Sequence, residues 1–190
     1  MIKILKTAVI ACSVMISVQN CTAQEVVMNR EVVTTGDGKM MLGPQTIDRF
    51  SAEPYSDWYL TEMNEYAVDQ EAIEQLKKEK IKTFKLTVFV GTWCSDSHRE
   101  FPRLMKILET VDYPMDKLTV YALNRKKESP TGEEGLYNIH KVPTIIVHKY
   151  DKEIGRITEM PASGWIERDL LDIVRKHDSF VKQLFKKEEK

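Results

Sequence analysis

The chain is poor in the residues that mark unusual proteins. Only 8 glycines, 7 prolines and 3 cysteines occur in 190 residues, so a low-complexity chain and a small disulfide-stapled scaffold are both excluded. Charge of either sign is not in excess, because 28 Lys and Arg stand against 29 Asp and Glu; a net charge of −1 offers no basic field to recruit nucleic acid. The remaining composition, 42% hydrophobic and 30% charged, is that of one globular domain with enough core to fold without staples.

Long hydrophobic runs are also scarce, and the longest lies near the beginning. Residues 7–18 carry no charge, follow two lysines and are too short to span a bilayer comfortably. The small residues of Cys21-Thr22-Ala23 predict cleavage before Gln24, so residues 1–23 are interpreted as a signal peptide. No later segment is apolar enough for a membrane helix. We expect a mature protein outside the cytoplasm, in the periplasm of a Gram-negative cell, with net charge −3 because two lysines and no acid leave with the leader.

Cys21 allows an alternative, a lipoprotein signal in which this cysteine is lipidated and anchors the protein to the membrane. Asn20 fits poorly, because a small residue is expected just before such a cysteine. Both outcomes consume Cys21, and Cys12 leaves with the signal, so Cys94 is the one free thiol of the mature chain. An odd cysteine in an exported protein indicates intermolecular pairing or a reactive thiol.

Residues 24–80 are predicted to form an N-terminal extension made of a short hairpin and helices. Gly36-Asp37-Gly38-Lys39 is a tight turn between short apolar runs. The pattern becomes helical from Ser56 to Lys80, with Asp69 as the N-cap of its second helix.

Residues 81–187 carry the pattern of an α/β domain with a mixed central sheet flanked by helices. The spacing of apolar residues predicts buried strands at 84–90 and 118–123, an antiparallel pair at 144–148 and 154–160, and helices at 95–109 and 165–185. There are no internal repeats.

This order of elements, with Trp93-Cys94-Ser95-Asp96-Ser97 after the first buried strand, resembles the thioredoxin family. Pro102, eight residues after Cys94, matches the family's helix-kinking proline, and Lys141-Val142-Pro143-Thr144 matches the segment of its cis-proline. The resemblance implies a thioredoxin-like fold over about residues 81–187, with Pro143 facing the active-site cysteine. The wider pattern from Gly91, with Arg156-Ile157 and Pro161, is similar to an exported thioredoxin-family group of Bacteroidetes-type bacteria.

The departures from the family narrow the chemistry. Ser97 replaces the resolving cysteine, which in a dithiol enzyme attacks the mixed disulfide and releases the substrate. Val88 stands where the family has a buried aspartate, and Ala122 where it has that aspartate's lysine partner. Any function must therefore be one that a single thiol, or none, can support.

Cys94 is the candidate nucleophile and Ser97 its candidate catalytic partner. Backbone N–H groups and the positive dipole end at a helix N-terminus favour the thiolate, and the Ser97 hydroxyl is placed to donate to it; the alternative for Ser97 is a plain helix-N-terminal hydroxyl. His98 and Asp96 are candidate modulators, because a protonated imidazole stabilises a thiolate and a carboxylate disfavours it. The alternatives are a solvent-facing His98 and an Asp96 that serves only as dipole partner and loop cap.

Trp93, Val142 and Pro143 are the candidate substrate-binding residues, because they border the groove at Cys94. His140 and His148 lack ligand partners at metal-site spacing, so neither a metal nor another cofactor is expected. The charges of Lys126-Lys127-Glu128 and Glu133-Glu134 are interpreted as a solvated loop.

The leading hypothesis is monothiol thiol–disulfide exchange with cysteine-containing proteins or small thiols. The alternative is a peptide- or protein-binding module that keeps the groove without the chemistry. A one-cysteine peroxidase is a weaker candidate, because peroxiredoxins place a threonine three residues before their cysteine and Thr92 is two before.

Overall fold

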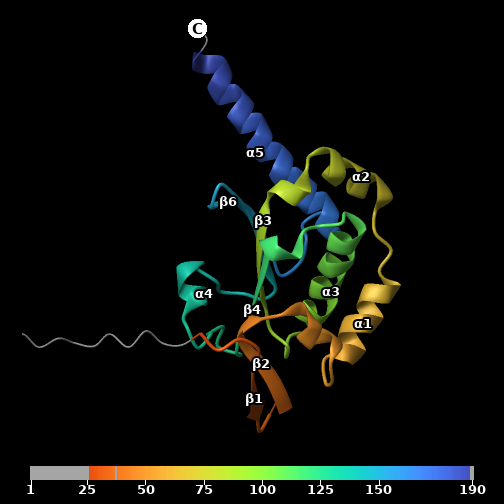
Figure 1. Cartoon of the computed structure of the whole chain (residues 1–190), viewed down its shortest axis with the longest axis vertical. Coiled ribbons are helices and arrows are strands. Elements are labelled where there is room, and N and C mark those ends of the chain that lie inside the picture. Colours follow the sequence, from red (N-terminus) through yellow and green to blue (C-terminus); the bar gives the residue numbers. More distant parts are fainter. Residues whose placement is uncertain (1–25, 37, 189–190) are drawn as a thin grey trace, which may run out of the picture.

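The computed structural model describes residues 26–36 and 38–188, with side chains as far as Ser179. It is an α/β protein built on a six-stranded mixed sheet in the order β1-β2-β4-β3-β5-β6, with helices on both sides (Figure 1). The strands are β1 Arg30–Thr34, β2 Gly38–Gln45, β3 Lys85–Val90, β4 Leu118–Ala122, β5 Thr144–Lys149 and β6 Lys152–Thr158. The helices are α1 Ser56–Glu65, α2 Gln70–Lys78, α3 Ser95–Thr110, α4 Glu133–Leu136 and α5 Ile166–Glu188, with short 3-10 turns at Ile47–Ser51, Ile81–Thr83 and Met115–Lys117.

The fold class predicted from the sequence, a mixed sheet flanked by helices, is confirmed. β3 lies in the middle, parallel to β4 and antiparallel to β5, and β5 continues into β6 as an antiparallel hairpin. Leu86 through Val90 are buried, which explains the unbroken apolar run of that strand. An α-helix that was not predicted, α4, forms a single turn that begins at Glu133, in the segment predicted as a solvated loop.

The N-terminal hairpin is part of the same sheet. Residues 38–42 of β2 pair antiparallel with β1, and residues 43–45 pair antiparallel with residues 120–122 of β4. Without this pairing β4 would present an open edge of backbone N–H and C=O groups. The division of the chain at residue 80 stays a prediction, and the structure joins its two parts through β2 and β4.

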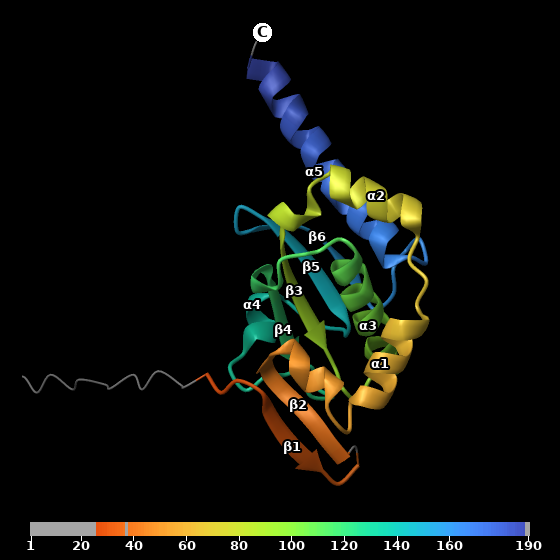
Figure 2. The same ribbon diagram turned by 45° about the vertical axis from the view of Figure 1, so that its right-hand side comes forward.

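The helices before β3 form as predicted and pack on the later part of the chain. Asp69 caps α2, because its Oδ1 accepts hydrogen bonds from the backbone N–H groups of Glu71 and Ala72 at 3.0 and 3.2 Å. α1 lies beside α3, and α2 beside the first half of α5 (Figure 2). The Phe50 ring packs on that of Phe101, with centroids 4.6 Å apart.

The two faces of the sheet bury apolar clusters of very different size. Alternate residues of a strand point to opposite faces, so Val88 of β3 lies on one face and Phe89 on the other. We call the cluster on the face of α1, α3 and α5 the large core; its fully buried members include Phe50, Ile73, Leu86, Val88, Phe101, Leu108 and Val174. We call the cluster on the face of α4 the small cluster, whose buried members are Phe89, Leu123, Ile139, Val142 and Ile146.

The predicted signal peptide, with Cys12 and Cys21, lies outside the described residues. Over residues 26–36 and 38–188, no helix has the length and apolar character needed to cross a membrane.

Candidate functional site

The Trp-Cys turn links the central strand directly to α3. After β3 ends, the Cys94 N–H donates to the Gly91 carbonyl at 2.9 Å and closes a tight turn. Cys94 has extended backbone angles and is the N-cap residue of α3, whose first helical hydrogen bond runs from the His98 N–H to the Cys94 carbonyl at 3.0 Å. The sequence prediction that a cysteine opens this helix is confirmed.

The Cys94 sulfur faces the segment of Pro143. Its Sγ lies 3.5 Å from the Val142 carbonyl oxygen, and the Val142–Pro143 peptide bond is cis, as the resemblance implies. The thiol is half-buried against the small cluster, and within the described part of the chain it is the one free cysteine. The sulfur makes no capping hydrogen bond with the first turn of α3, and its hydrogen bond is with the segment of Val142 and Pro143.

Ser97 is bound to the strand. Its side chain is 1% exposed, and its Oγ accepts a hydrogen bond from the Gly91 N–H at 3.1 Å. The structure shows no hydrogen bond from the Ser97 hydroxyl to the Cys94 sulfur, and both residues lie in the described part of the chain. Ser97 therefore ties the end of β3 to the first turn of α3, and its catalytic role stays a prediction.

His98 is half-buried and packs against Trp58 of α1. Its ring stacks on Trp58 with centroids 4.3 Å apart and planes 11° apart. Its Nε2 lies 2.8 Å from the Thr92 carbonyl oxygen, and since a carbonyl only accepts, this nitrogen carries a hydrogen. That hydrogen bond directs Nε2 to the backbone of the turn.

Asp96 is paired on the outside of α3. Its Oδ1 lies 3.2 Å from the Arg99 guanidinium, one helical turn further on. The same guanidinium lies 2.6 Å from Glu100 Oε1, so Arg99 offsets only part of the negative charge that was expected to oppose a thiolate.

Trp93 is half-buried and contacts three parts of the chain. Its Nε1–H donates to the Leu123 carbonyl at 2.8 Å, which fixes the ring against the end of β4. Above the ring lie two cations, with Arg125 Cζ at 5.0 Å and Lys127 Nζ at 5.5 Å from its centroid. Below the ring lies Gly91, where an added Cβ would come within 2.8 Å of Trp93 Cε2. Trp93 forms a rigid wall beside the sulfur.

Two residues of the turn were missed by the sequence analysis. Gly91 is needed because the Trp93 ring occupies the space of its side chain. Thr92 joins three parts of the fold, because its Oγ1 accepts from the Met41 N–H of β2 at 3.2 Å while its carbonyl receives His98. A sequence signal for Gly91 exists, because it is a glycine that directly follows a buried strand and stands two residues before a tryptophan. No comparable signal points to Thr92.

The interpretation of the charged residues after β4 as a solvated loop does not hold for Lys127. Lys127 is half-buried with its ammonium over Trp93, so this part of the predicted solvated loop belongs to the wall of the site.

Val88 and Ala122 are the residues that the resemblance matches to a buried aspartate and its lysine partner in the thioredoxin family. Val88 and Ala122 are both 0% exposed and both belong to the large core. Neither can carry a proton to or from a second thiol.

His148 and His140 lie outside this site. Burial lowers the pKa of His148, whose Nε2 has no hydrogen-bond partner, and Nε2 of His140 lies 3.0 Å from Asn138 Oδ1. Among the described residues, no group of three His, Cys, Asp or Glu side chains is arranged to hold a metal ion.

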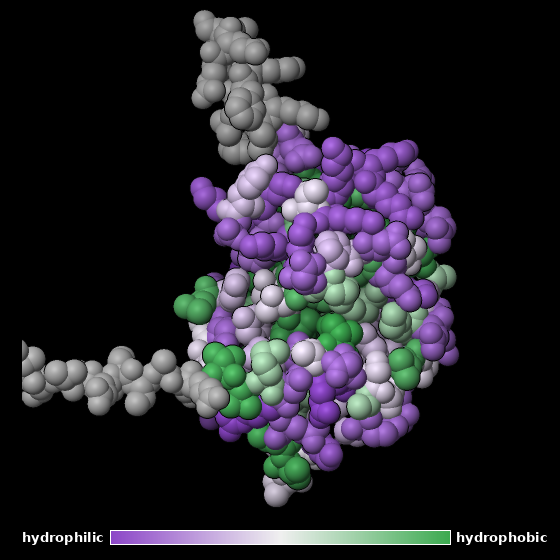
Figure 3. All heavy atoms as spheres, in the orientation of Figure 1, coloured by the Kyte–Doolittle hydropathy of each residue, from purple (hydrophilic) through white to green (hydrophobic). Residues whose placement is uncertain are grey.

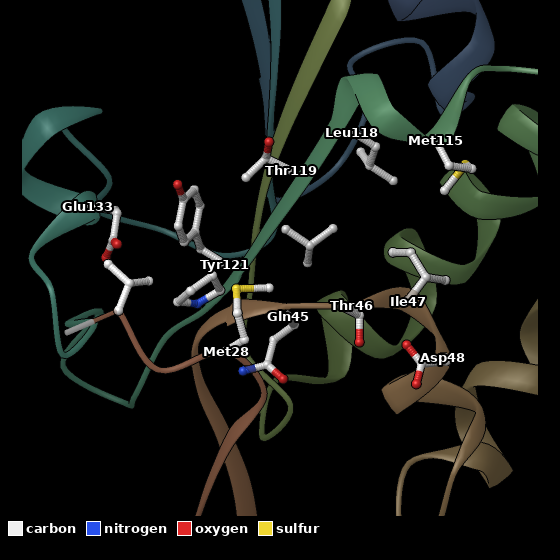
Figure 4. A pocket seen from close by; sticks show the side chains of 13 residues that line it. Met28, Gln45, Thr46, Ile47, Asp48, Met115, Leu118, Thr119, Tyr121 and Glu133 are labelled. Atoms are coloured by element: carbon white, nitrogen blue, oxygen red, sulfur yellow. The ribbon is translucent and has the colours of Figure 1, made fainter.

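One cavity lies away from the thiol. It has a volume of about 770 Å³ and opens where β2 leaves β4, lined by Met28, Gln45, Ile47, Met115, Leu118 and Tyr121 among others (Figure 4). Apolar atoms gather in the middle of the face seen in Figure 3, whereas hydrophilic atoms cover the region of α2. None of the candidate site residues lines this cavity.

Comparison with known proteins assigns no family. No family model matches the chain, and no curated protein matches it. Among solved structures, the chain is similar to PA1234 from Pseudomonas aeruginosa, a protein of unknown function, with a TM-score of 0.49, 12% identity, and coverage of 67% of this chain and 86% of that one. It is also similar to an HIV epitope scaffold, with a TM-score of 0.36, 11% identity, and coverage of 66% of this chain and 98% of that one.

Proposed function

We propose that this is an exported, periplasmic protein of thioredoxin-like fold in which Cys94 performs monothiol thiol–disulfide exchange. The observation that carries the proposal is the placement of one half-buried sulfur at the N-cap of α3, 3.5 Å from the Val142 carbonyl and beside the rigid wall of Trp93. Such a sulfur is held in a fixed direction and is still open to a partner.

The thioredoxin-like part of the proposal rests on the arrangement of the elements after residue 81. A parallel β3–α3–β4 unit is followed by an antiparallel β5–β6 hairpin and a final helix, and Pro143 stands next to the cysteine. This is the arrangement that the resemblance of the Trp-Cys motif implies. β1, β2, α1 and α2 are then additions to it.

The chemistry follows from having one sulfur. The Cys94 thiolate attacks one sulfur of a partner disulfide, forms a mixed disulfide and expels the other sulfur as a thiolate. A second thiol, from the partner protein or from a small thiol, then attacks the mixed disulfide and regenerates Cys94. The cycle moves disulfides without net oxidation or reduction, which suits isomerisation and removal of small-thiol adducts.

Two features of the surroundings support this role. α3 begins at Cys94, so the positive end of its dipole lies at this residue, and Arg99, which also binds Glu100, offsets part of the charge of Asp96. Apolar Val88 and Ala122 agree with a site that has no resolving thiol to serve.

The proposal is tested by mass spectrometry of the folded mature protein, from which residues 1–23 with Cys12 and Cys21 have been removed, after incubation with an oxidised small thiol and with a disulfide-containing protein. We expect one mixed-disulfide adduct on the native chain and none on Cys94→Ser, while Ser97→Ala, which keeps the sulfur, still forms it. An unmodified native Cys94, under conditions where the urea-unfolded chain is modified, contradicts the proposal.

The second candidate function is a binding module. It is favoured because Cys94 packs against the small cluster, as a side chain with a structural role would. Trp93, Val142 and Pro143 would then hold an extended segment without chemistry. Equal partner affinity of the native protein and Cys94→Ser, without adducts, distinguishes this function from the first.

A further inference from the structure

We infer that the cavity of Figure 4 is a binding site for a linear aliphatic diamine, whose two ammonium groups pair with Asp48 and Glu133. We call it the β2–β4 cavity. The inference goes beyond the proposed function, because none of the candidate site residues around Cys94 lines this cavity.

The β2–β4 cavity has the size and the walls of a small-molecule site. Its volume of about 770 Å³ lies within the usual range of ligand pockets, about 300–1,000 Å³. Much of its wall is apolar and includes Val26, Met28, Ile47, Met115, Leu118 and Val120. The two methionines are exposed, and their flexible thioether chains can adapt to the shape of a ligand. The middle of the cavity is therefore suited to an aliphatic chain.

The charges in the lining are all of one sign. Among the residues that line the cavity, Asp48 and Glu133 are acidic and none is Lys, Arg or His. Figure 4 shows these two side chains at opposite ends, with the apolar side chains of Leu118 and Met28 between them. A carboxylate at each end of an apolar wall matches a chain that carries a cation at each end.

Glu133, at the first end, is held by neutral groups. Its carboxylate accepts hydrogen bonds from the hydroxyl groups of Ser129 and Thr131, which fix its position without neutralising its charge. The two oxygens of a carboxylate offer about four acceptor positions, so two hydroxyl groups leave room for an ammonium group. Within the described residues, Glu133 takes part in no ion pair.

Asp48, at the second end, is exposed and also lacks a cation. It lies in the 3-10 turn after β2, and its neighbour Arg49 is directed to Glu31 instead, with Nη2 and Oε2 3.9 Å apart. In the part of the chain that the structure describes, Asp48 forms no ion pair. The ammonium group of a ligand therefore meets no competing cation in the lining at this end.

A buried amide in the same wall also lacks a donor. Gln45 is 6% exposed, and its Nε2 donates to the Leu42 carbonyl at 2.9 Å, whereas its Oε1 has no hydrogen-bond partner among the described residues. An acceptor of this kind favours a ligand that brings N–H groups over one that brings acceptors alone.

The two ion pairs determine the selectivity that we expect. An ion pair near the surface changes affinity by up to about fivefold at low ionic strength, and salt weakens it. Replacing one ammonium group of the ligand by a methyl group should thus lower affinity by about fivefold. Replacing both by hydroxyl groups should lower it further, and carboxylates at both ends should be repelled.

The test is calorimetric titration of the folded mature protein, without residues 1–23, at low salt. Linear diamines of increasing length first give the best-fitting chain. The diamine, monoamine, diol and dicarboxylate of that length are then compared, and we expect affinity to fall in this order and the differences to shrink at high salt. A diol that binds as tightly as the diamine, or a diamine that does not bind at any length, overturns the inference.

Variants of the two acids test the ion pairs. Asp48→Asn should weaken the diamine by about fivefold and leave it little tighter than the monoamine, and Glu133→Gln should act in the same direction. Asp57→Asn makes the same charge change on the exposed surface of α1, outside the cavity, and should change nothing. A diamine affinity that neither Asp48→Asn nor Glu133→Gln lowers overturns the inference.

The methionines report where the probe binds. With ¹³C-labelled methyl groups, the diamine should shift the NMR signals of Met28 and Met115, which line the cavity, and not that of Met160, which is exposed elsewhere. A shift of Met160 alone contradicts the assignment. Cys94→Ser should bind the diamine with unchanged affinity, so this inference and the proposed exchange chemistry can fail separately.

Discussion

The two faces of the sheet differ in what their burial achieves. On the face of α1, α3 and α5, side chains from almost every element meet in the large core, and most of them are fully buried. On the face of α4, five buried residues are ringed by half-buried ones, and Trp93 and Cys94 are among that ring. The site thus lies on the small cluster, whereas α3, which carries Cys94 at its N-terminus, packs in the large core.

The comparison teaches why this site is both ordered and open. α3 buries Phe101, Leu104 and Leu108 in the large core, so the helix that carries Cys94 has a fixed position. The sulfur itself lies on the other face beside Val142, where the cysteine is half-buried. Stability and access are therefore supplied by different faces.

The largest test of this comparison is a matched pair of truncations. Phe101→Ala in the large core should lower the free energy of unfolding by about 3–5 kcal/mol, because a fully packed site cannot collapse around the cavity. Phe89→Ala in the small cluster should cost less, about 3 kcal/mol at the lower end of the usual range, since its half-buried neighbours can close over the space. Urea unfolding of both variants decides the matter, and equal losses would show that the two clusters are energetically alike.

A smaller loss of stability is expected at Gly91, in the turn between β3 and α3. Gly91→Ala places a methyl group within 2.8 Å of Trp93 Cε2, so the ring or the turn must shift, at a cost of about 1–3 kcal/mol. Because the ring borders Cys94, the rate of mixed-disulfide formation should fall as well. Gly36→Ala, where an added Cβ meets nothing within 4 Å, serves as the control and should change neither quantity. A Gly91→Ala protein with native reactivity would show that Trp93 is not a wall of the site.

The smallest effect concerns alkaline pH and belongs to the large core. Burial raises the pKa of Tyr59 to about 12, with a further contribution from Glu109. The folded state holds this proton more tightly than the unfolded chain, so the contribution is complete below about pH 10, where free tyrosine begins to titrate, and is lost as pH rises toward 12.

Tyr59→Phe should therefore flatten the fall of the free energy of unfolding above about pH 10, measured by urea titrations at a series of pH values. Tyr150→Phe, whose ring is 84% exposed, should leave that fall unchanged. An unaltered pH dependence in Tyr59→Phe would argue against a tightly packed ring at this position.

Much of this arrangement could be predicted from the chain because local patterns dictate it. The apolar run of β3, the helical spacing after Cys94 and the capping Asp69 each determine their own element. The joining of β2 to β4 could not be predicted, since strand pairing between distant segments leaves no local pattern. In the site, the resemblance of the motif predicted that Cys94 lies beside Val142. The hydrogen bonds of Ser97, Thr92 and His98 could not be predicted, because they depend on which backbone groups lie near these side chains in the folded chain.

The fixed position of Trp93 has a practical consequence for spectroscopy. The chain has three tryptophans, and each lies in a different environment: Trp58 is stacked on His98, Trp165 packs near Tyr66, and Trp93 borders the sulfur. Replacing Trp58 and Trp165 by phenylalanine would leave one native indole at the site. Its emission, quenched when a disulfide forms beside it, would let each encounter with a partner be followed in real time without an added dye.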